Sequence, residues 1–215
     1  MDQNSKVSRD RVIREMKRTL RNDMREKRDN ESKIIRTEWD RQITKRFMTS
    51  KFYLQSNYLL CYANFGSEVD TQRIIQRALT DGKKVYAPKI IDSDYMEFYK
   101  ITKLSDLSIS SYGIPEPNES EVYFDPEKLD QENAIACMVI PGLAFDKKMH
   151  RMGYGKGYYD KYLNWQIEAS KDPLCDLLFK VALCYDFQMM NQVPVTNDDF
   201  KMDCIMTESA TYLPS

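Results

Sequence analysis

Two continuous apolar runs of strand length, at residues 58–63 and 135–140, and a third segment at residues 179–184 that is apolar except for Lys180, constrain the fold more than any other feature of this chain. A strand that is apolar at every position is buried on both faces, as in a parallel sheet that helices cover on both sides. Segments with helical spacing, such as residues 68–82, separate the runs. The sequence therefore predicts an α/β fold with a largely parallel central sheet.

Two helices are predicted before the first strand, at about residues 8–28 and 32–49. Apolar residues recur on each at helical spacing, and Trp39 of the second helix is expected in the core rather than at a ligand. No internal repeat or low-complexity linker interrupts the chain. Residues 1–215 are therefore expected to form a single domain, with residues 1–50 as a helical N-terminal arm.

Three further strands are predicted at residues 85–90, 96–101 and 204–206. Pro88 cannot donate to a neighbouring strand, so the first of these strands is expected to be irregular or near an edge at that position. Residues 118–133 are polar and acidic and are predicted to form a surface loop.

The composition is that of a well-solvated globular protein. Of the 215 residues, 42% are apolar and 30% are charged. No stretch approaches the length of a membrane span, and the N-terminus has no apolar signal core. We therefore expect a soluble, cytoplasmic protein with no membrane partner.

The cysteines and the single histidine do not form a recognisable metal or disulfide framework. The five cysteines are widely separated and include no C-x-x-C pair, which favours reduced, buried thiols. His150 is the only histidine and is expected to be a solvated loop residue. A histidine-cluster metal site and Ser-His-Asp catalysis are therefore disfavoured.

Charge is distributed unevenly although the net charge is −1. Residues 1–51 hold 16 Lys and Arg against 9 Asp and Glu, whereas the remaining residues hold 16 against 24. A basic arm of this kind is typical of proteins that bind nucleic acid or nucleotide phosphates, and charge alone leaves both open.

A glycine-rich segment follows the second apolar run. Gly153, Gly155 and Gly157 alternate with other residues, and Arg151 and Lys156 add positive charge just before a predicted helix. Glycines allow positive φ and let backbone N–H groups converge on an anion, and a helix N-terminus adds to the same point. The spacing is neither that of a Walker A loop nor that of the dinucleotide fingerprint. Spacing alone leaves open a phosphate site or a flexible turn.

The same segment is similar to the signature of a known family. P-G-L-A-F-D at residues 141–146 and R-M-G-Y-G-K-G-Y-Y-D at residues 151–160 resemble the 5-formyltetrahydrofolate cyclo-ligase family, also called 5,10-methenyltetrahydrofolate synthetase. Shorter matches are K-x-x-x-R at residues 17–21, G-I-x-E-P at residues 113–117 and V-P followed by two aspartates at residues 193–203. The resemblance extends over nearly the whole chain.

The resemblance implies a three-layer α/β sandwich and a specific reaction. The expected activity is ATP-dependent closure of 5-formyltetrahydrofolate to 5,10-methenyltetrahydrofolate, with ADP and phosphate released. In this family the γ-phosphoryl group passes to the formyl oxygen, and N10 then attacks the activated carbon. Mg²⁺ is the expected metal, and the N-terminal arm is expected to contribute to the ATP site.

The resemblance also assigns roles to residues of this chain. The residues expected to bind ATP are Lys17, Arg21, Arg151, Gly153, Gly155, Lys156 and Gly157. The expected catalytic residues are Lys156, Tyr158 and Tyr159. Those expected to contact the folate are Ala63, Glu68, Tyr112, Tyr154 and Tyr158, and those expected to hold the metal are Asp160 and Asp199.

Each role has a structural alternative. Lys17 and Arg21 are spaced as ordinary solvated charges on one helix face, and Glu68 and Asp160 as charges at a helix start. The alternative role of Asp199 is a loop cap. The alternative for Tyr158 and Tyr159 is a place in the core.

Two departures from the family pattern put substrate affinity and polyglutamate preference in question. Tyr154 stands where many relatives have a basic or other polar residue, and Tyr112 stands where some relatives have tryptophan. The alternatives to the enzyme are a divergent family member without this activity and a nucleic-acid-binding protein that uses the basic arm. The intact glycine segment favours the enzyme. The expected partners are small-molecule substrates rather than nucleic acid, and the protein is expected to be a monomer.

Overall fold

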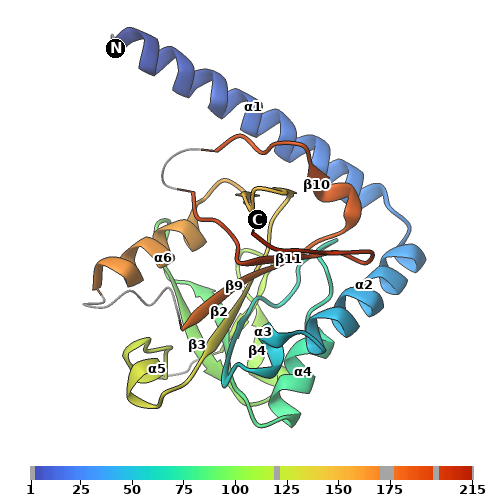
Figure 1. Ribbon diagram of the computed structural model, residues 1–215, viewed down its shortest axis with the longest axis vertical. Coiled ribbons are helices and arrows are strands. Elements are labelled where there is room, and N and C mark those ends of the chain that lie inside the picture. The colour runs from blue at the N-terminus through green and yellow to red at the C-terminus, as the bar shows by residue number, and fades with distance from the viewer. Residues whose placement is uncertain (1–2, 119–121, 170–176, 196–198, 215) are drawn as a thin grey trace.

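The computed structural model describes residues 3–118, 122–169, 177–195 and 199–214 and is built on one large sheet (Figure 1). Its seven strands are, in spatial order, β12 (Thr211–Tyr212), β11 (Cys204–Met206), β9 (Leu178–Leu183), β6 (Ala136–Ile140), β1 (Tyr58–Cys61), β2 (Lys84–Ile90) and β3 (Met96–Ile101). The five inner strands are parallel, and the two edge strands are antiparallel to their neighbours. The prediction of an α/β fold with a largely parallel sheet is confirmed.

Helices cover both faces of this sheet, as the three-layer prediction requires. On one face lie α2 (Lys33–Met48), α3 (Lys51–Leu54) and α4 (Gln72–Thr80), and on the other lie α5 (Glu127–Gln131) and α6 (Tyr158–Ala169). Side chains alternate along each strand, because successive residues of a strand point to opposite faces.

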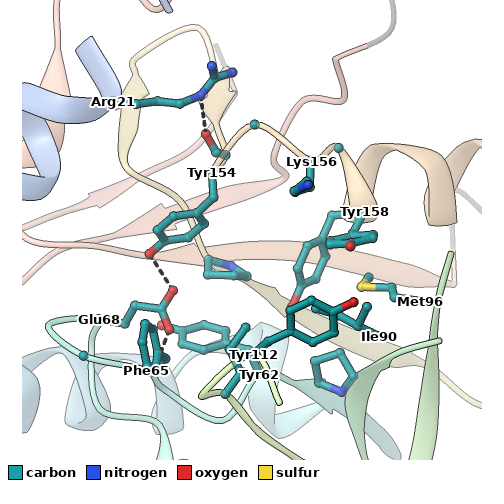
Figure 2. A pocket seen from close by; sticks show the side chains of 18 of the residues that line it. Arg21, Tyr62, Phe65, Glu68, Ile90, Met96, Tyr112, Tyr154, Lys156 and Tyr158 are labelled. Atoms are coloured by element: carbon teal, nitrogen blue, oxygen red, sulfur yellow. Dashed lines mark hydrogen bonds between the residues drawn. The ribbon is translucent and has the colours of Figure 1, made fainter. Parts of the chain in front are cut away.

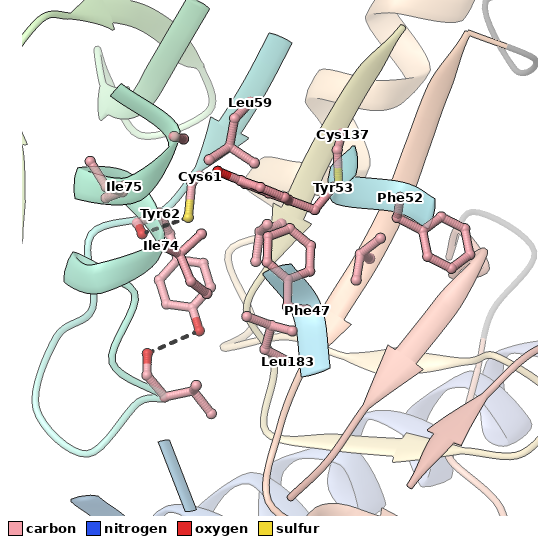
Figure 3. Packing of buried hydrophobic residues seen from close by; sticks show 14 of the residues in the cluster. Phe47, Phe52, Tyr53, Leu59, Cys61, Tyr62, Ile74, Ile75, Cys137 and Leu183 are labelled. Carbon is pink, nitrogen blue, oxygen red and sulfur yellow. Dashed lines mark hydrogen bonds between the residues drawn. The ribbon is translucent and has the colours of Figure 1, made fainter. Parts of the chain in front are cut away.

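The strand β1 shows this alternation directly. Leu59 and Cys61 belong to the core cluster under α2, α3 and α4, whereas Tyr58 and Leu60 belong to the cluster under α5 and α6. Figure 3 shows the first cluster, in which Phe47, Phe52, Ile74 and their neighbours pack against the strands. The strand β1 is therefore buried on both faces, as β6 is, whereas β9 is partly exposed at Phe179 and Lys180.

Smaller elements account for most of the differences from the sequence prediction. Two short sheets were not predicted: one orders β10 (Met189–Met190), β7 (Ala144–Asp146) and β8 (Arg151–Met152), and the other pairs β4 (Leu107–Ile109) with β5 (Pro115–Pro117). The predicted loop at residues 118–133 was wrong in part, since it contains α5, which the fully buried Leu129 anchors.

The N-terminal helix α1 (Gln3–Asn30) starts earlier and ends later than predicted. It crosses one end of the domain, and its N-terminal part extends beyond it (Figure 1). Leu20 and Met24 pack against a small apolar cluster of the β7 and β8 region that includes Leu143 and Met152. This packing places α1 beside the loop that follows β8. None of the helices in the described ranges combines the length and the apolar character that a membrane crossing requires.

Pro88 and four of the five cysteines lie as the sequence predicted. Pro88 pairs with Phe98 of β3 but lies beyond the part of β2 that pairs with β1, in agreement with the expected edge character. Four cysteines are buried and free, and burial raises their pKa. Cys175 lies outside the described residues.

The prediction for His150 was wrong. Its ring is only 16% exposed, and Nδ1 lies 3.0 Å from Oδ2 of the fully buried Asp146. The sequence places these residues four apart in a polar stretch, which suggested solvent. The hairpin of β7 and β8 turns the imidazole back onto the carboxylate instead.

Gly142→Ala is expected to lower the free energy of unfolding by about 2 kcal/mol, because an added Cβ would lie 2.5 Å from Phe145 Cζ and 3.1 Å from Arg151 Cγ. Chemical denaturation measures this change. Ser105→Ala is the control, since Ser105 is exposed in the short helix Leu104–Asp106. An equal loss of stability in both variants would contradict the prediction.

Candidate active site

A cavity of about 760 Å³ opens beyond the carboxyl ends of β1 and β6, where ligands of parallel α/β sheets bind. Its walls come from α1, the loop after β1, the strand β2, the β4 and β5 hairpin and the loop between β8 and α6 (Figure 2). All the residues to which the sequence assigned a site role line it: Lys17, Arg21, Ala63, Glu68, Tyr112, Arg151, Gly153, Tyr154, Gly155, Lys156, Gly157, Tyr158, Tyr159, Asp160 and Asp199. The fold therefore brings together segments that are widely separated in the chain.

The glycine loop has two backbone features that anion sites share, positive φ at glycine and a helix start. Gly155 and Gly157 adopt φ of +106° and +72°, values that favour glycine, and α6 begins at the next residue, Tyr158. The unpaired N–H groups of the first turn of α6 therefore point toward the end of the loop. Gly153 has no positive φ and is needed instead for clearance, because a Cβ there would meet Arg151.

Two basic residues of α1 contact this region. Arg21 Nε donates to Gly153 O at 3.0 Å, and Lys17 Nζ lies 2.7 Å from Asp199 Oδ2. Burial lowers the pKa of Arg21. Lys156 is exposed at the cavity, and its ammonium group makes no hydrogen bond or ion pair with the described residues. Positive charge thus reaches the glycine loop from both α1 and the loop itself.

Arg151 lies beneath the loop rather than free in the cavity. It is 7% exposed, its Nη2 donates to both carboxylate oxygens of Asp160 at 3.0 and 2.9 Å, and its Nη1 donates to Pro141 O at 3.2 Å. Its guanidinium carbon is 5.7 Å from the ring centroid of Tyr159. The pair of Arg151 and Asp160 fixes the start of α6 against the end of β6.

The two tyrosines of α6 differ. The hydroxyl of Tyr159 is buried and has no hydrogen-bond partner among the described residues, and burial raises its pKa well above the usual value. A buried polar group in this state is an expected donor to a ligand or to water. Tyr158 donates to Asp92 O at 3.3 Å. Both rings also pack against the core cluster that contains Phe98. The alternative that Tyr158 and Tyr159 belong to the core is therefore correct in part.

Glu68 faces the cavity from the loop after β1. Its Oε1 accepts from the Tyr154 hydroxyl at 2.5 Å, and its Oε2 accepts from Phe65 N at 2.9 Å (Figure 2). Burial raises the pKa of Glu68, and these hydrogen bonds act in the opposite direction. Ala63 is buried two residues beyond the end of β1, and Tyr112 is 56% exposed in the hairpin of β4 and β5.

The candidate metal ligands are both engaged by cations in this structure: Asp160 by Arg151, and Asp199 by Lys17. Within the described ranges no group of three or more His, Cys, Asp or Glu side chains could hold a metal ion. Mg²⁺ usually binds through one or two carboxylates together with substrate phosphates. The residues present therefore fit a Mg²⁺ ion that is bound together with a nucleotide.

Some lining residues were missed in the sequence. Arg25 and Arg28 continue the face of α1 that carries Lys17 and Arg21, and their spacing of three and four residues could have shown this. Glu116, 6% exposed, accepts from Ile90 N at 3.1 Å; it was matched to a family motif but given no role.

Comparisons with known proteins agree with the motif resemblance. The model of the 5-formyltetrahydrofolate cyclo-ligase family matches residues 13–208. The "Probable 5-formyltetrahydrofolate cyclo-ligase" of Schizosaccharomyces pombe is 37% identical over 145 residues, which cover 65% of this chain and 69% of that protein. The 5-formyltetrahydrofolate cyclo-ligase of Mus musculus is 26% identical over 203 residues, which cover 93% of this chain and 97% of that protein.

A solved structure is also similar throughout. That of 5,10-methenyltetrahydrofolate synthetase from Aquifex aeolicus aligns with a TM-score of 0.72 and 26% identity, and the alignment covers 92% of each chain. With the cavity and its glycine loop, these likenesses show that the chain belongs to the 5-formyltetrahydrofolate cyclo-ligase family, a family of ligase-type enzymes.

Proposed function

We propose that this protein catalyses the ATP-dependent cyclisation of 5-formyltetrahydrofolate to 5,10-methenyltetrahydrofolate. The observation that carries the proposal is the single cavity in which the glycine loop, the basic face of α1 and Glu68 meet. The reaction needs a phosphoryl donor and a folate side by side, and a cavity of about 760 Å³ lies within the range that holds small-molecule ligands.

The nucleotide would bind at the glycine loop. The N–H groups of the loop and of the first turn of α6, together with Lys156, Arg21 and Lys17, surround the space for the phosphates. Arg151 would act mainly by holding Asp160 and the start of α6, since its guanidinium is already shared with that carboxylate.

The folate would bind against Glu68, Tyr154 and the tyrosines of α6. The formyl oxygen is a poor leaving group, so its phosphorylation by ATP prepares the carbon for attack by N10, and phosphate then leaves. The protein contributes position and neutralisation of charge, which account for most of the catalysis of phosphoryl transfer. The Tyr159 hydroxyl, which has no hydrogen-bond partner among the described residues, would donate to an oxygen of the reacting groups.

Mg²⁺, when bound with ATP, would neutralise charge on the phosphate oxygens. Asp199→Asn is expected to raise the Mg²⁺ concentration for half-maximal turnover roughly tenfold, because it removes a charged oxygen ligand. Mg²⁺ titration of the initial rate measures this, with Asp94→Asn as the control, since Asp94 is an exposed aspartate that pairs with Lys161. An unchanged Mg²⁺ dependence in Asp199→Asn would show that Asp199 does not bind the metal. Asp160→Asn tests Asp160 in the same way, against the same control.

An absorbance assay tests the proposal directly. Purified protein is incubated with 5-formyltetrahydrofolate, ATP and Mg²⁺, and the more conjugated methenyl product is followed in the ultraviolet, with ATP omitted as the control. Product that depends on ATP would support the cyclo-ligase. A folded protein that binds ATP and forms no product would instead favour a divergent family member.

The rival function, nucleic-acid binding by the N-terminal arm, is less well supported. Lys17, Arg21 and Arg28 line the cavity rather than an outer surface of α1. Binding to RNA or DNA that weakens steeply with salt, in a protein without cyclisation, would favour the rival. The cytoplasmic location and the monomeric state remain predictions from the sequence.

A further inference from the structure

One hydrogen bond joins the two loops that the proposed function assigns to different substrates. Tyr154 lies between Gly153 and Gly155 in the glycine loop, and its hydroxyl donates to Glu68 Oε1 at 2.5 Å. Glu68 belongs to the loop after β1 (Figure 2), to which the proposed function assigns the folate. The bond therefore links the glycine loop, which is proposed to hold the nucleotide, to the loop after β1, which is proposed to hold the folate.

Arg28 of α1 supports both ends of this bond. It is 5% exposed, its guanidinium carbon lies 5.6 Å from the ring centroid of Tyr154, and its Nε donates to Ser67 Oγ at 3.0 Å. Ser67 in turn donates to Asp29. One buried cation thus packs on the tyrosine ring and holds the residue that precedes Glu68.

The carboxylate of Glu68 has a fixed orientation as a result. Tyr154 holds one oxygen, and the backbone N–H of Phe65 holds the other at 2.9 Å. Hydrogen bonds to a carboxylate are stronger than those between neutral groups, so they determine the position of this side chain. Removal of the Tyr154 hydroxyl would take away the hydrogen bond that Glu68 Oε1 accepts from it.

We infer that Arg28 and Tyr154 are positioning residues for Glu68, and that the Tyr154–Glu68 hydrogen bond couples nucleotide binding on the glycine loop to folate binding at Glu68. This inference rests on the proposed function. Phosphates held by the N–H groups beside Gly155 and Gly157 would order the loop, and the loop would then hold the Tyr154 hydroxyl in place for the carboxylate. Such coupling is reciprocal, so each ligand would tighten the other by the same factor.

The test measures that factor directly. The dissociation constant of 5-formyltetrahydrofolate is determined with and without a saturating, non-hydrolysable ATP analogue and Mg²⁺. In the wild-type protein the analogue is expected to tighten folate binding roughly tenfold, within the range of coupling energies found between sites. In Tyr154→Phe, which keeps the ring under Arg28, the factor is expected to fall below about twofold, and the KM for the folate to rise roughly tenfold with little change in kcat.

Tyr123→Phe is the matched control, since Tyr123 is 56% exposed and does not line the cavity. A coupling factor in Tyr154→Phe equal to that of the wild type would overturn the inference, as would a wild-type protein without coupling. Should Tyr154→Phe unfold, Arg28→Lys and Arg28→Met replace it. Lysine can still donate to Ser67, so it is expected to retain more of the coupling than methionine, and equal coupling in both would overturn the role of Arg28.

Failure of the inference and failure of the proposed function are distinguishable. The proposed function fails when the wild-type protein forms no methenyl product. The inference fails by itself when the wild-type protein forms product and the bound nucleotide leaves the affinity for the folate unchanged.

Discussion

Lys156→Ala is expected to lower kcat/KM for ATP by about 10²–10³-fold while the fold stays intact. Lys156 lies in the glycine loop, is exposed to the cavity and has no hydrogen bond or ion pair with the part of the chain that the structure describes. Its charge is therefore available to the phosphates, and the loss of one such donor to a developing negative charge typically costs this much. Steady-state rates at varied ATP concentration measure the change.

Lys147→Ala is the control for this variant, because Lys147 is also exposed, lies nine residues earlier in the chain and does not line the cavity. Lys156→Arg is expected to recover part of the rate, since it restores the charge but not the shape. A Lys156→Ala protein with the wild-type rate would contradict the assignment of the phosphate site to the glycine loop.

Asp146→Ala is expected to lower the free energy of unfolding by about 3 kcal/mol. The carboxylate is fully buried and accepts from the backbone N–H groups of Lys148, His150 and Val193 at 2.9, 3.1 and 2.9 Å, while the His150 ring lies 3.0 Å away. Alanine would leave these buried donors unpaired and release the β7 and β8 hairpin from the segment of Val193. Denaturant unfolding measures the loss.

The pH dependence gives an independent check on Asp146. Burial would raise its pKa, but the hydrogen bonds from Val193 and His150 outweigh burial and hold the pKa below the usual value. A depressed pKa in the folded state stabilises the protein above the unfolded pKa of about 3.9, and this contribution is lost as the pH falls through the folded pKa. The difference in stability between the wild type and Asp146→Ala is therefore expected to narrow below about pH 4.

Asp94→Ala is the control for stability, since Asp94 is exposed and its ion pair with Lys161 lies at the surface. No loss of stability is expected for it. An Asp146→Ala protein as stable as the wild type, or a difference that does not depend on pH, would contradict the role given to the buried carboxylate.

The sequence by itself determined the type of fold and part of the backbone conformation of the glycine loop. Continuous apolar runs can only be satisfied by burial on both faces, so the parallel sheet and its helical layers followed from local pattern. The positive φ of Gly155 and Gly157 and the helix start at Tyr158 also followed from residue types that are close in the chain.

Short elements escaped the sequence because their stability comes from contacts with distant residues. The helix α5 depends on the burial of Leu129, and the two-residue strand β8 exists because it pairs with β7. His150 is held by Asp146, although its polar neighbours suggested solvent. Local propensity carries little information about segments this short.

Only the tertiary structure decided which side chains meet around the cavity. Tyr154 and Glu68 are 86 positions apart, and Lys17 and Asp199 are 182 apart, so no spacing rule relates them. The large sheet places the carboxyl ends of β1 and β6 side by side, and the small sheet that follows β6 carries the glycine loop after β8. The packing of Leu20 and Met24 lays the basic face of α1 across both loops. The sequence supplied the functional groups, and the long-range packing set their distances, because a parallel sheet brings the carboxyl ends of its strands to one edge whatever their order in the chain.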